Sequence, residues 1–218
     1  MTALWVERGD TFFTHSKSML GRLIRWGETD PGETNGTWAN HTGVVVESGW
    51  IGTPDFGANL DTIAAGLRTA QASPRQAVVV EALWHVRRGP IKLNGIEVRV
   101  FRPSPAYTEE EKLRLVTEAD TYVGARYGWW KLFGLLGDRM IFRGKKVISK
   151  LFFIKSRPIC SFLAAIANEA GRRIGTTVRL HTAAQATWPG FGMAPQSADP
   201  DEMMDFCLSH PEFWEEVK

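Results

Sequence analysis

A cysteine at the start of an apolar helix constrains the fold of this chain more than any other feature. Pro158 disfavours helix at the residue before it, so the helix is expected to begin near Cys160. Residues 162–170 are rich in helix formers and can bury at least one face, and Gly171 is a natural end. In the first turn, unpaired N–H groups and the helix dipole favour a thiolate. Cys160 is therefore a candidate nucleophile, with a small buried hydrophobic residue as the alternative.

The composition narrows the class of protein. The chain has 218 residues, of which 44% are hydrophobic and 23% charged, and it shows no internal repeat or linker. These values favour one globular domain spanning residues 1–218. A net charge of +2 is too small to indicate a nucleic-acid partner. Two cysteines, Cys160 and Cys207, indicate neither a disulfide framework nor a zinc site, and we expect no cofactor or metal.

The sequence indicates a soluble cytoplasmic protein. Residues 1–8 lack the basic head and apolar run of a signal peptide, and no apolar stretch reaches the ~20 residues that span a bilayer. Residues 129–155 are apolar and basic together. Such a segment suits contact with an anionic membrane surface, although a lid or a packed helix with a basic outer side is the preferred interpretation.

Four short strands are predicted, and two further segments are candidate strands. Residues 41–47 and 77–84 are β-branched apolar runs, and residues 96–102 alternate between apolar and polar. Residues 11–14 follow a turn at Gly9, and residues 86–94 have room for a further short strand. Because consecutive strands are joined by loops too irregular for βαβ crossovers, we expect an α+β fold, with a small antiparallel sheet or barrel packed against helices.

Helices are predicted between these strands and after them in the sequence. Thr108 and Glu111 have the spacing of a capping box, and the helix that they open is expected to run to about Val123. Its expected buried residues are Leu113, Val116, Ala119 and Val123. The other predicted helices cover residues 16–26, residues 60–70 and a segment that begins at Asp199-Pro200-Asp201-Glu202. Residues 176–180 have the composition of a strand.

Cysteine chemistry also needs an imidazole and a group that orients it. His41 opens one predicted strand, and Glu81 interrupts the apolar run of the next. If these strands pair, His41 and Glu81 are neighbours, and we expect the Cys160 sulfur within about 4 Å of a His41 ring nitrogen. Glu47 lies six residues after His41, about 20 Å along an extended strand, and is too far to orient the ring. The other histidines are expected at the surface: His15, His85, His181 and His210.

Six short stretches, in this order along the chain, together resemble a known family. They are Gly9-Asp10-Thr11-Phe12, His41-Thr42-Gly43-Val44-Val45, Val80-Glu81-Ala82, Gly124-Ala125-Arg126-Tyr127-Gly128-Trp129, Cys160-Ser161 and Asp199-Pro200-Asp201-Glu202-Met203. The chain resembles the circularly permuted branch of the NlpC/P60 superfamily. These papain-like hydrolases include YiiX-type proteins and, more distantly, the lecithin retinol acyltransferases.

The resemblance implies a permuted papain-like fold and a role for each matching residue. Cys160 corresponds to the nucleophile, His41 to the proton shuttle, and Glu81 to the residue that orients the imidazole. Tyr127 stands where the family has a tyrosine that often helps to bind the oxyanion.

The chain departs from the family pattern at three positions. Ile159 precedes the cysteine where an aromatic residue is common, and Phe162 stands where a small or acidic residue is common. Gly128 stands where an aspartate is frequent. These departures concern the substrate pocket more than the three catalytic candidates.

The leading functional prediction is a thiol hydrolase of the cysteine peptidase or amidase type that cleaves an amide bond, for example in a cell-wall peptide. One alternative keeps the nucleophile but makes the substrate a lipid acyl ester or amide, hydrolysed or transferred at a membrane surface. The other alternative is an inactive binding protein with the same fold. A thiol probe distinguishes the last of these, because an inactive site leaves Cys160 no more reactive than Cys207.

Overall fold

A computed structural model gives the structure of the protein. It describes residues 3–17, 38–52, 75–91, 93, 96–128, 133–134, 141, 158–172, 190–193, 195 and 198–218. The predicted helix at 60–70 and the predicted strand at 176–180 lie outside the described residues, as do all but the first two residues of the predicted helix at 16–26. Of the apolar and basic segment 129–155, only Phe133, Gly134 and Ile141 are described.

The centre of the fold is a six-stranded sheet in which every neighbouring pair is antiparallel. Its strands, in order across the sheet, are β6 (Val86–Pro90), β5 (Val78–Ala82), β3 (His41–Glu47), β2 (Thr11–His15), β7 (Glu97–Pro103) and β8 (Trp214–Val217). The α+β class and the antiparallel sheet are thus confirmed. The barrel is not: within the part of the chain that the structure describes, the sheet stays open, with β6 and β8 as its edges.

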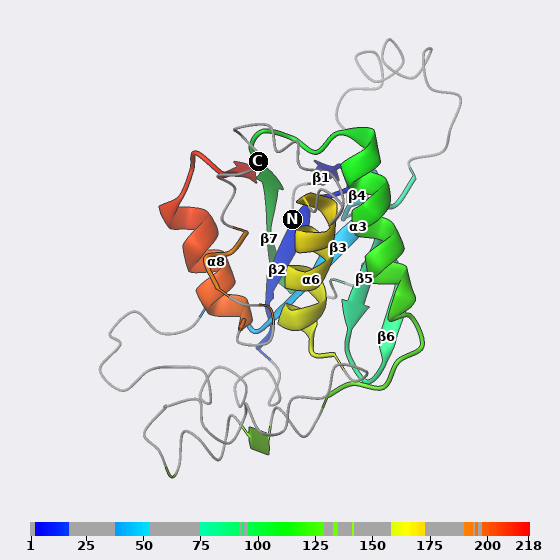
Figure 1. The fold of residues 1–218 in the computed structure, drawn as a ribbon, viewed down its shortest axis with the longest axis vertical. Helices are drawn as coiled ribbons and strands as arrows, with labels where there is room; N and C mark the ends of the chain where they lie inside the picture. The colour runs from blue at the N-terminus through cyan, green and yellow to red at the C-terminus, as the bar shows by residue number, and fades with distance from the viewer. Residues whose placement is uncertain are drawn as a thin grey trace, which may run out of the picture.

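In the described part of the chain, three helices lie on one face of this sheet, with α6 between α3 and α8 (Figure 1). They are α3 (Glu109–Thr121), α6 (Cys160–Arg172) and α8 (Pro200–Ser209). Sheet residues Val44, Val80 and Phe101 form one continuous core with apolar side chains of all three helices. The small residues of α6 let it lie close to the sheet, and nearly all of its side chains are buried.

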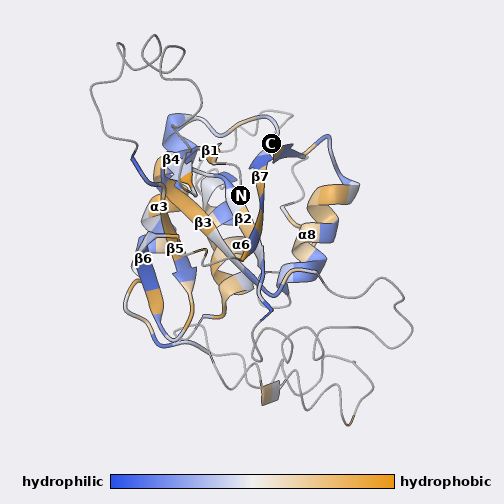
Figure 2. Ribbon diagram, turned by 180° about the vertical axis from the view of Figure 1, so that it is seen from behind, coloured by the Kyte–Doolittle hydropathy of each residue, from blue (hydrophilic) through white to orange (hydrophobic). Residues whose placement is uncertain are grey.

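The opposite face of the sheet carries a second, smaller core. There the strands β1 (Leu4–Val6) and β4 (Gly49–Ile51) form a two-stranded antiparallel sheet (Figures 1 and 2). Val6 and Ile51 of the two-stranded sheet cluster with Phe12, Val45 and Val79 of the six-stranded sheet. These three residues alternate along their strands with residues that face the helices. Strands β1, β4 and β8 are three or four residues long and were not predicted, because so short a run gives no clear period.

Helix α3 begins as predicted but buries a different face. Thr108 caps it: its side chain accepts the Glu111 N–H, and the Glu111 carboxylate accepts the Thr108 N–H. The buried stripe is Glu111, Leu115 and Ala119, which turns toward α6. The prediction that Leu113 and Val123 are buried is wrong, because Leu113 lies off this stripe and Val123 follows the helix; Val116 is half-buried.

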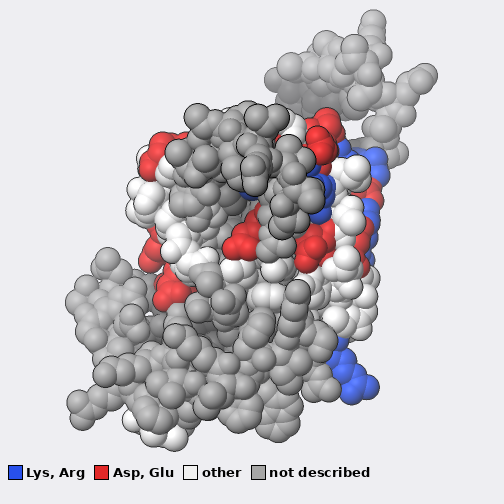
Figure 3. All heavy atoms as spheres, viewed as in Figure 1, with Lys and Arg blue, Asp and Glu red and all other residues white. Residues whose placement is uncertain are grey.

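Charges of both signs are mixed on the described surface. Acidic and basic side chains lie next to one another along the right-hand edge of the view in Figure 3. At α3 they form the ion pairs Arg8–Glu109, Lys112–Glu109 and Arg114–Glu110. In the described part of the chain, no helix is both long enough and apolar enough to cross a membrane.

Candidate active site

Helix α6 presents Cys160 at its first position. The turn forms because the Leu163 N–H donates to the Ile159 carbonyl, while Ser161 Oγ donates to the Ala198 carbonyl and fixes the start of the helix. Further along, Asn168 ties the helix to β2 through Thr11 Oγ1 at 2.9 Å. Cys160 is only 3% exposed, so its thiol lies in a largely dry environment at a helix N-terminus.

The register of β3 and β5 brings His41 and Glu81 together. Gly43 lies directly opposite Glu81, and His41 precedes Gly43 by two residues, so His41 and Glu81 are diagonal neighbours on one face. The His41 Nε2–H donates to Glu81 Oε2 at 2.7 Å. Both side chains are mostly buried, at 14% and 5% exposed, so water competes little for this bond.

Gly43 permits this close packing because it has no side chain. A Cβ atom at this position would lie 2.7 Å from the Phe12 ring on β2 and 2.7 Å from the Val80 carbonyl oxygen on β5. The Phe12 ring instead occupies that space, with its centre 6.1 Å from the centre of the His41 ring. A glycine two residues after the histidine thus keeps β2, β3 and β5 in register beside the site.

The structure also brings Cys160 to His41. The Cys160 thiol lies close enough to the imidazole for a hydrogen bond with it to act on the pKa values of both groups, and the backbone groups of Thr42 and Ser161 lower the pKa of the thiol. Because Nε2 of His41 is bonded to Glu81, the ring nitrogen that remains for Cys160 is Nδ1. The three residues proposed from the sequence therefore form one connected chain of side chains from α6, β3 and β5.

The pKa values of these groups favour an ion pair. Burial lowers the pKa of His41, but its hydrogen bonds to Cys160 and Glu81 outweigh burial and raise that pKa to about 10. Burial raises the pKa of the Cys160 thiol, whereas the hydrogen bond and charge of His41 pull it below its ordinary value. Both shifts favour the thiolate–imidazolium form of the pair.

Glu81 has a second cationic neighbour that the sequence reasoning missed. Arg87 lies directly opposite Glu81 on β6, and its Nη2 donates to Oε1 of that carboxylate. Burial raises the pKa of Glu81, but the bond and charge of His41 and the charge of Arg87 outweigh burial and hold the pKa below its ordinary value. The sequence could have indicated this pair, because positions 81 and 87 face each other in a hairpin whose turn is centred on Trp84.

The segment before His41 is held by side chains that the sequence reasoning also missed. Oδ1 of Asp201, in the first turn of α8, accepts the N–H groups of Trp38 at 2.8 Å and Ala39 at 2.9 Å. The Asn40 side chain bonds both the N–H and the carbonyl of Ser16. The chain therefore enters β3 along a fixed path. The acidic helix start was noticed in the sequence only as a helix signal.

Tyr127 lies in a loop that runs beside the site. Its N–H donates to the Trp84 carbonyl, in the turn after Glu81, and the N–H of Gly128 donates to the Pro158 carbonyl, just before Cys160. The Tyr127 ring is half-buried against the main core. Its contribution to an oxyanion site stays a prediction.

The other candidate groups lie elsewhere. Glu47 pairs with Arg75 and Arg88 at the far end of β3. Of the remaining histidines, His85 is exposed, His15 and His210 are half-buried, and His181 lies outside the described residues. Cys207 is buried in α8, and burial raises its pKa well above the ordinary value. Among the described residues, no group of three or more His, Cys, Asp and Glu side chains has an arrangement that could hold a metal ion.

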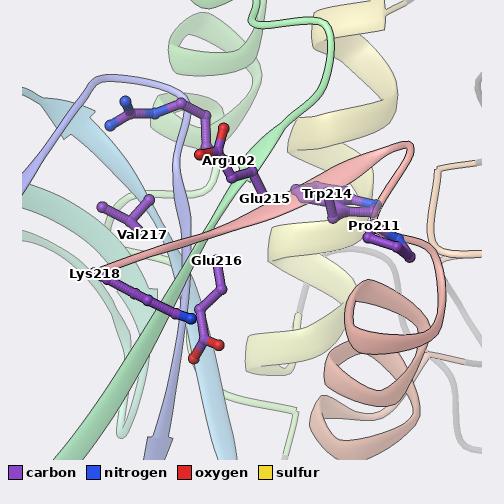
Figure 4. Close-up of a pocket in the computed structure, with 7 residues that line it drawn as sticks. All are labelled: Arg102, Pro211, Trp214, Glu215, Glu216, Val217 and Lys218. Atoms are coloured by element: carbon purple, nitrogen blue, oxygen red, sulfur yellow. The ribbon is translucent and has the colours of Figure 1, made fainter.

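A hollow of about 560 Å³ lies at the β7–β8 edge of the sheet (Figure 4). Its lining residues are Arg102, Pro211, Trp214, Glu215, Glu216, Val217 and Lys218. None of Cys160, His41 and Glu81 contributes to it, so this hollow is separate from the candidate active site.

No protein-family model matches the chain, and no curated protein sequence matches it. The crystal structure of the metalloprotein YiiX from Escherichia coli O157:H7 is similar, with a TM-score of 0.42 and 17% sequence identity. The alignment covers 75% of this chain and 66% of that one, so this chain spans slightly less than two thirds of the YiiX chain.

Proposed function

We propose that the protein is a thiol hydrolase that cleaves an amide bond through an acyl-enzyme on Cys160. The observation that carries the proposal is the placement of Cys160 beside His41, which is itself hydrogen-bonded to Glu81. Nucleophilic catalysis by cysteine requires a thiolate, a proton donor beside it and a group that holds the donor in place. The three side chains supply these functions in that order.

The mechanism follows from the protonation states. The Cys160 thiolate attacks the carbonyl carbon and forms the C–S bond, while the oxyanion that develops is stabilised by N–H groups at the start of α6. The His41 imidazolium gives its proton to the leaving nitrogen, and the C–N bond breaks. Neutral His41 then takes a proton from water, which attacks the thioester. Breaking of the C–S bond restores the thiolate and the imidazolium.

The same arrangement supports our proposal of kinship with the circularly permuted NlpC/P60 hydrolases. In this chain the histidine strand and the acidic strand both precede the nucleophile helix. That order is the one for which the permuted branch is named. A peptide of the cell wall is the substrate that this kinship favours.

A specific observation favours a second candidate substrate, a lipid acyl ester or amide. The turn after Glu81 exposes two apolar side chains: Leu83 is 39% exposed and Trp84 is 73% exposed. This turn lies at the end of the sheet where β3 begins with His41, because β3 and β5 are antiparallel. An acyl chain held at Cys160 would gain free energy by covering such a surface.

A panel of carbonyl substrates tests the proposed function. The full chain is incubated with cell-wall peptide fragments, aryl amides and aryl esters of short and long acyl chains, and intact mass spectrometry is used to detect an acyl adduct. We expect an adduct on wild-type protein, product release, and loss of both in Cys160→Ala. Cys207→Ala is the matched control and should behave as wild type, because its thiol is buried and protonated.

The outcomes distinguish the three functional hypotheses. Turnover of amides supports the hydrolase, and turnover of long-chain esters alone supports the acyl alternative. Selective reaction of Cys160 with a thiol probe, without turnover of any panel member, points to the inactive binding protein. A Cys160 thiol that reacts no faster than Cys207 would rule out an activated nucleophile.

A further inference from the structure

Arg87 and His41 share the carboxylate of Glu81. Arg87 reaches Oε1 from β6, on one side, while His41 is bonded to Oε2 from β3, on the other. Both groups lower the pKa of Glu81. The carboxylate is thus engaged through both oxygens, and its plane is fixed by two strands that are not neighbours of each other.

The four side chains balance in charge. In the thiolate–imidazolium form of the site, Arg87 and His41 are cations, and Glu81 and Cys160 are anions. Burial makes this balance matter, because Glu81 is 5% exposed and His41 is 14% exposed, so water can neutralise little of an excess charge. Without Arg87 the same state would carry one uncompensated negative charge.

The neighbouring arginine shows what an ordinary ion pair in this hairpin looks like. Arg88 is 36% exposed and pairs with Glu47 and Asp120, whose side chains are about one-third exposed. The partner of Arg87 is almost fully buried. Moreover, Nε of Arg87 is buried without a hydrogen-bond partner among the described residues, so its side chain is held in place through Glu81 rather than by a network of its own.

We propose that Arg87 is a positioning residue of the candidate active site, which keeps Glu81 ionised and turned toward His41 and so sustains the thiolate of Cys160. This inference rests on the proposed function, because it assigns Arg87 to the same chain of groups. Arg87 acts through Glu81 and not on the substrate. Both consequences of losing its charge, a less ionised Glu81 and an uncompensated anion, make the thiolate harder to form.

The test is the pH dependence of iodoacetamide labelling of Cys160, followed by mass spectrometry from pH 4 to 9. Wild-type protein should show an acid limb, where labelling falls as the thiolate is protonated. In Arg87→Met this limb should move upward by about one pH unit. Arg87→Lys keeps the charge and should stay near wild type. Arg88→Met, on the same strand, should leave the limb unchanged.

A second cycle separates positioning from mere stabilisation. In a Glu81→Gln background, Arg87→Met should cause no further shift, because the effect passes through the carboxylate. The double variant has no unpaired carboxylate at position 81. It can therefore be compared with Glu81→Gln even if Arg87→Met alone does not fold. The proposal is overturned if the acid limb of Cys160 labelling lies at the same pH in Arg87→Met as in wild type. It is also overturned if Arg87→Met still shifts this limb in the Glu81→Gln background. The proposed function fails separately, if wild-type Cys160 reacts no faster than Cys207.

Discussion

At the scale of single residues, the site depends on interactions that overcome burial. Burial opposes the charged form of each member of the Cys160, His41 and Glu81 chain. The charged forms are nevertheless favoured, because a partner of opposite sign lies beside each group and because the backbone groups of Thr42 and Ser161 lower the pKa of the thiol. The balance of these terms, rather than the helix dipole alone, accounts for a thiolate here, since a helix N-terminus contributes only about 0.3–1 kcal/mol.

Replacing His41 with alanine is therefore predicted to slow the labelling of Cys160. Without the imidazolium, burial dominates and the pKa of the thiol rises to its ordinary value of about 8.5 or above, so little thiolate exists near pH 6. We expect iodoacetamide labelling at pH 6 to slow by about tenfold or more, allowing for the lower intrinsic reactivity of a low-pKa thiolate. The slow labelling of Cys207 should not change, and Glu81→Gln should have a smaller effect. Equal Cys160 rates in wild type and His41→Ala would show that His41 does not activate the thiol.

At the scale of elements, the sequence predicted those parts that local patterns determine. Apolar, β-branched runs identified β3 and β5, alternation identified β7, the capping box identified the start of α3, and Pro158 identified the start of α6. Contacts that depend on register were out of reach. The pairing of Glu81 with Arg87 requires the hairpin register, and the bonds from Asp201 to Trp38 and Ala39 join segments more than 160 residues apart.

The link between α8 and the start of β3 gives a prediction about stability. Burial and the charges of Asp205 and Asp199 raise the pKa of Asp201 to about 6, despite the N–H bonds from Ala39 and Trp38 that lower it. An unfolded chain has an aspartate pKa near 3.9. The proton on Asp201 therefore stabilises the fold below about pH 4, and this contribution is lost as the pH rises through about 6.

Asp201→Asn should remove this loss, because the amide keeps a carbonyl oxygen for the two N–H groups and does not ionise. We expect the free energy of unfolding of the variant to exceed that of wild type by about 1–3 kcal/mol at pH 7.5. This gain is reduced by the ~0.3–1 kcal/mol with which the helix dipole stabilises the ionised Asp201 of wild type in the first turn of α8. At pH 3.5 the two proteins should be nearly equal. Urea unfolding across this range measures the difference. A stability difference that does not vary with pH would contradict the titration of Asp201.

At the scale of the whole molecule, one end of the sheet collects the groups on which the proposed function depends. The start of β3, the end of β5, the turn that follows it and the first turn of α6 are joined there by hydrogen bonds. The main core and the second core on the opposite sheet face hold these elements in place. The sequence indicated this meeting through the resemblance, but it did not show that Leu83 and Trp84 remain exposed beside the site, since an apolar turn is ordinarily expected to be buried.

The exposed turn distinguishes a peptide substrate from an acyl one. Covering ~100 Å² of the Trp84 ring with an acyl chain would contribute about 2.5 kcal/mol, of which ordering of the chain cancels a part. For an acyl substrate, Trp84→Ala should therefore raise KM for a long-chain aryl ester by about tenfold, while kcat and the KM of the acetyl ester stay the same. Trp5→Ala is the matched control, because Trp5 is 45% exposed but lies on β1, where it contacts Trp50. If Trp84→Ala leaves KM unchanged for esters of every length, the acyl chain does not bind this turn, and the amide of a cell-wall peptide remains the substrate to pursue.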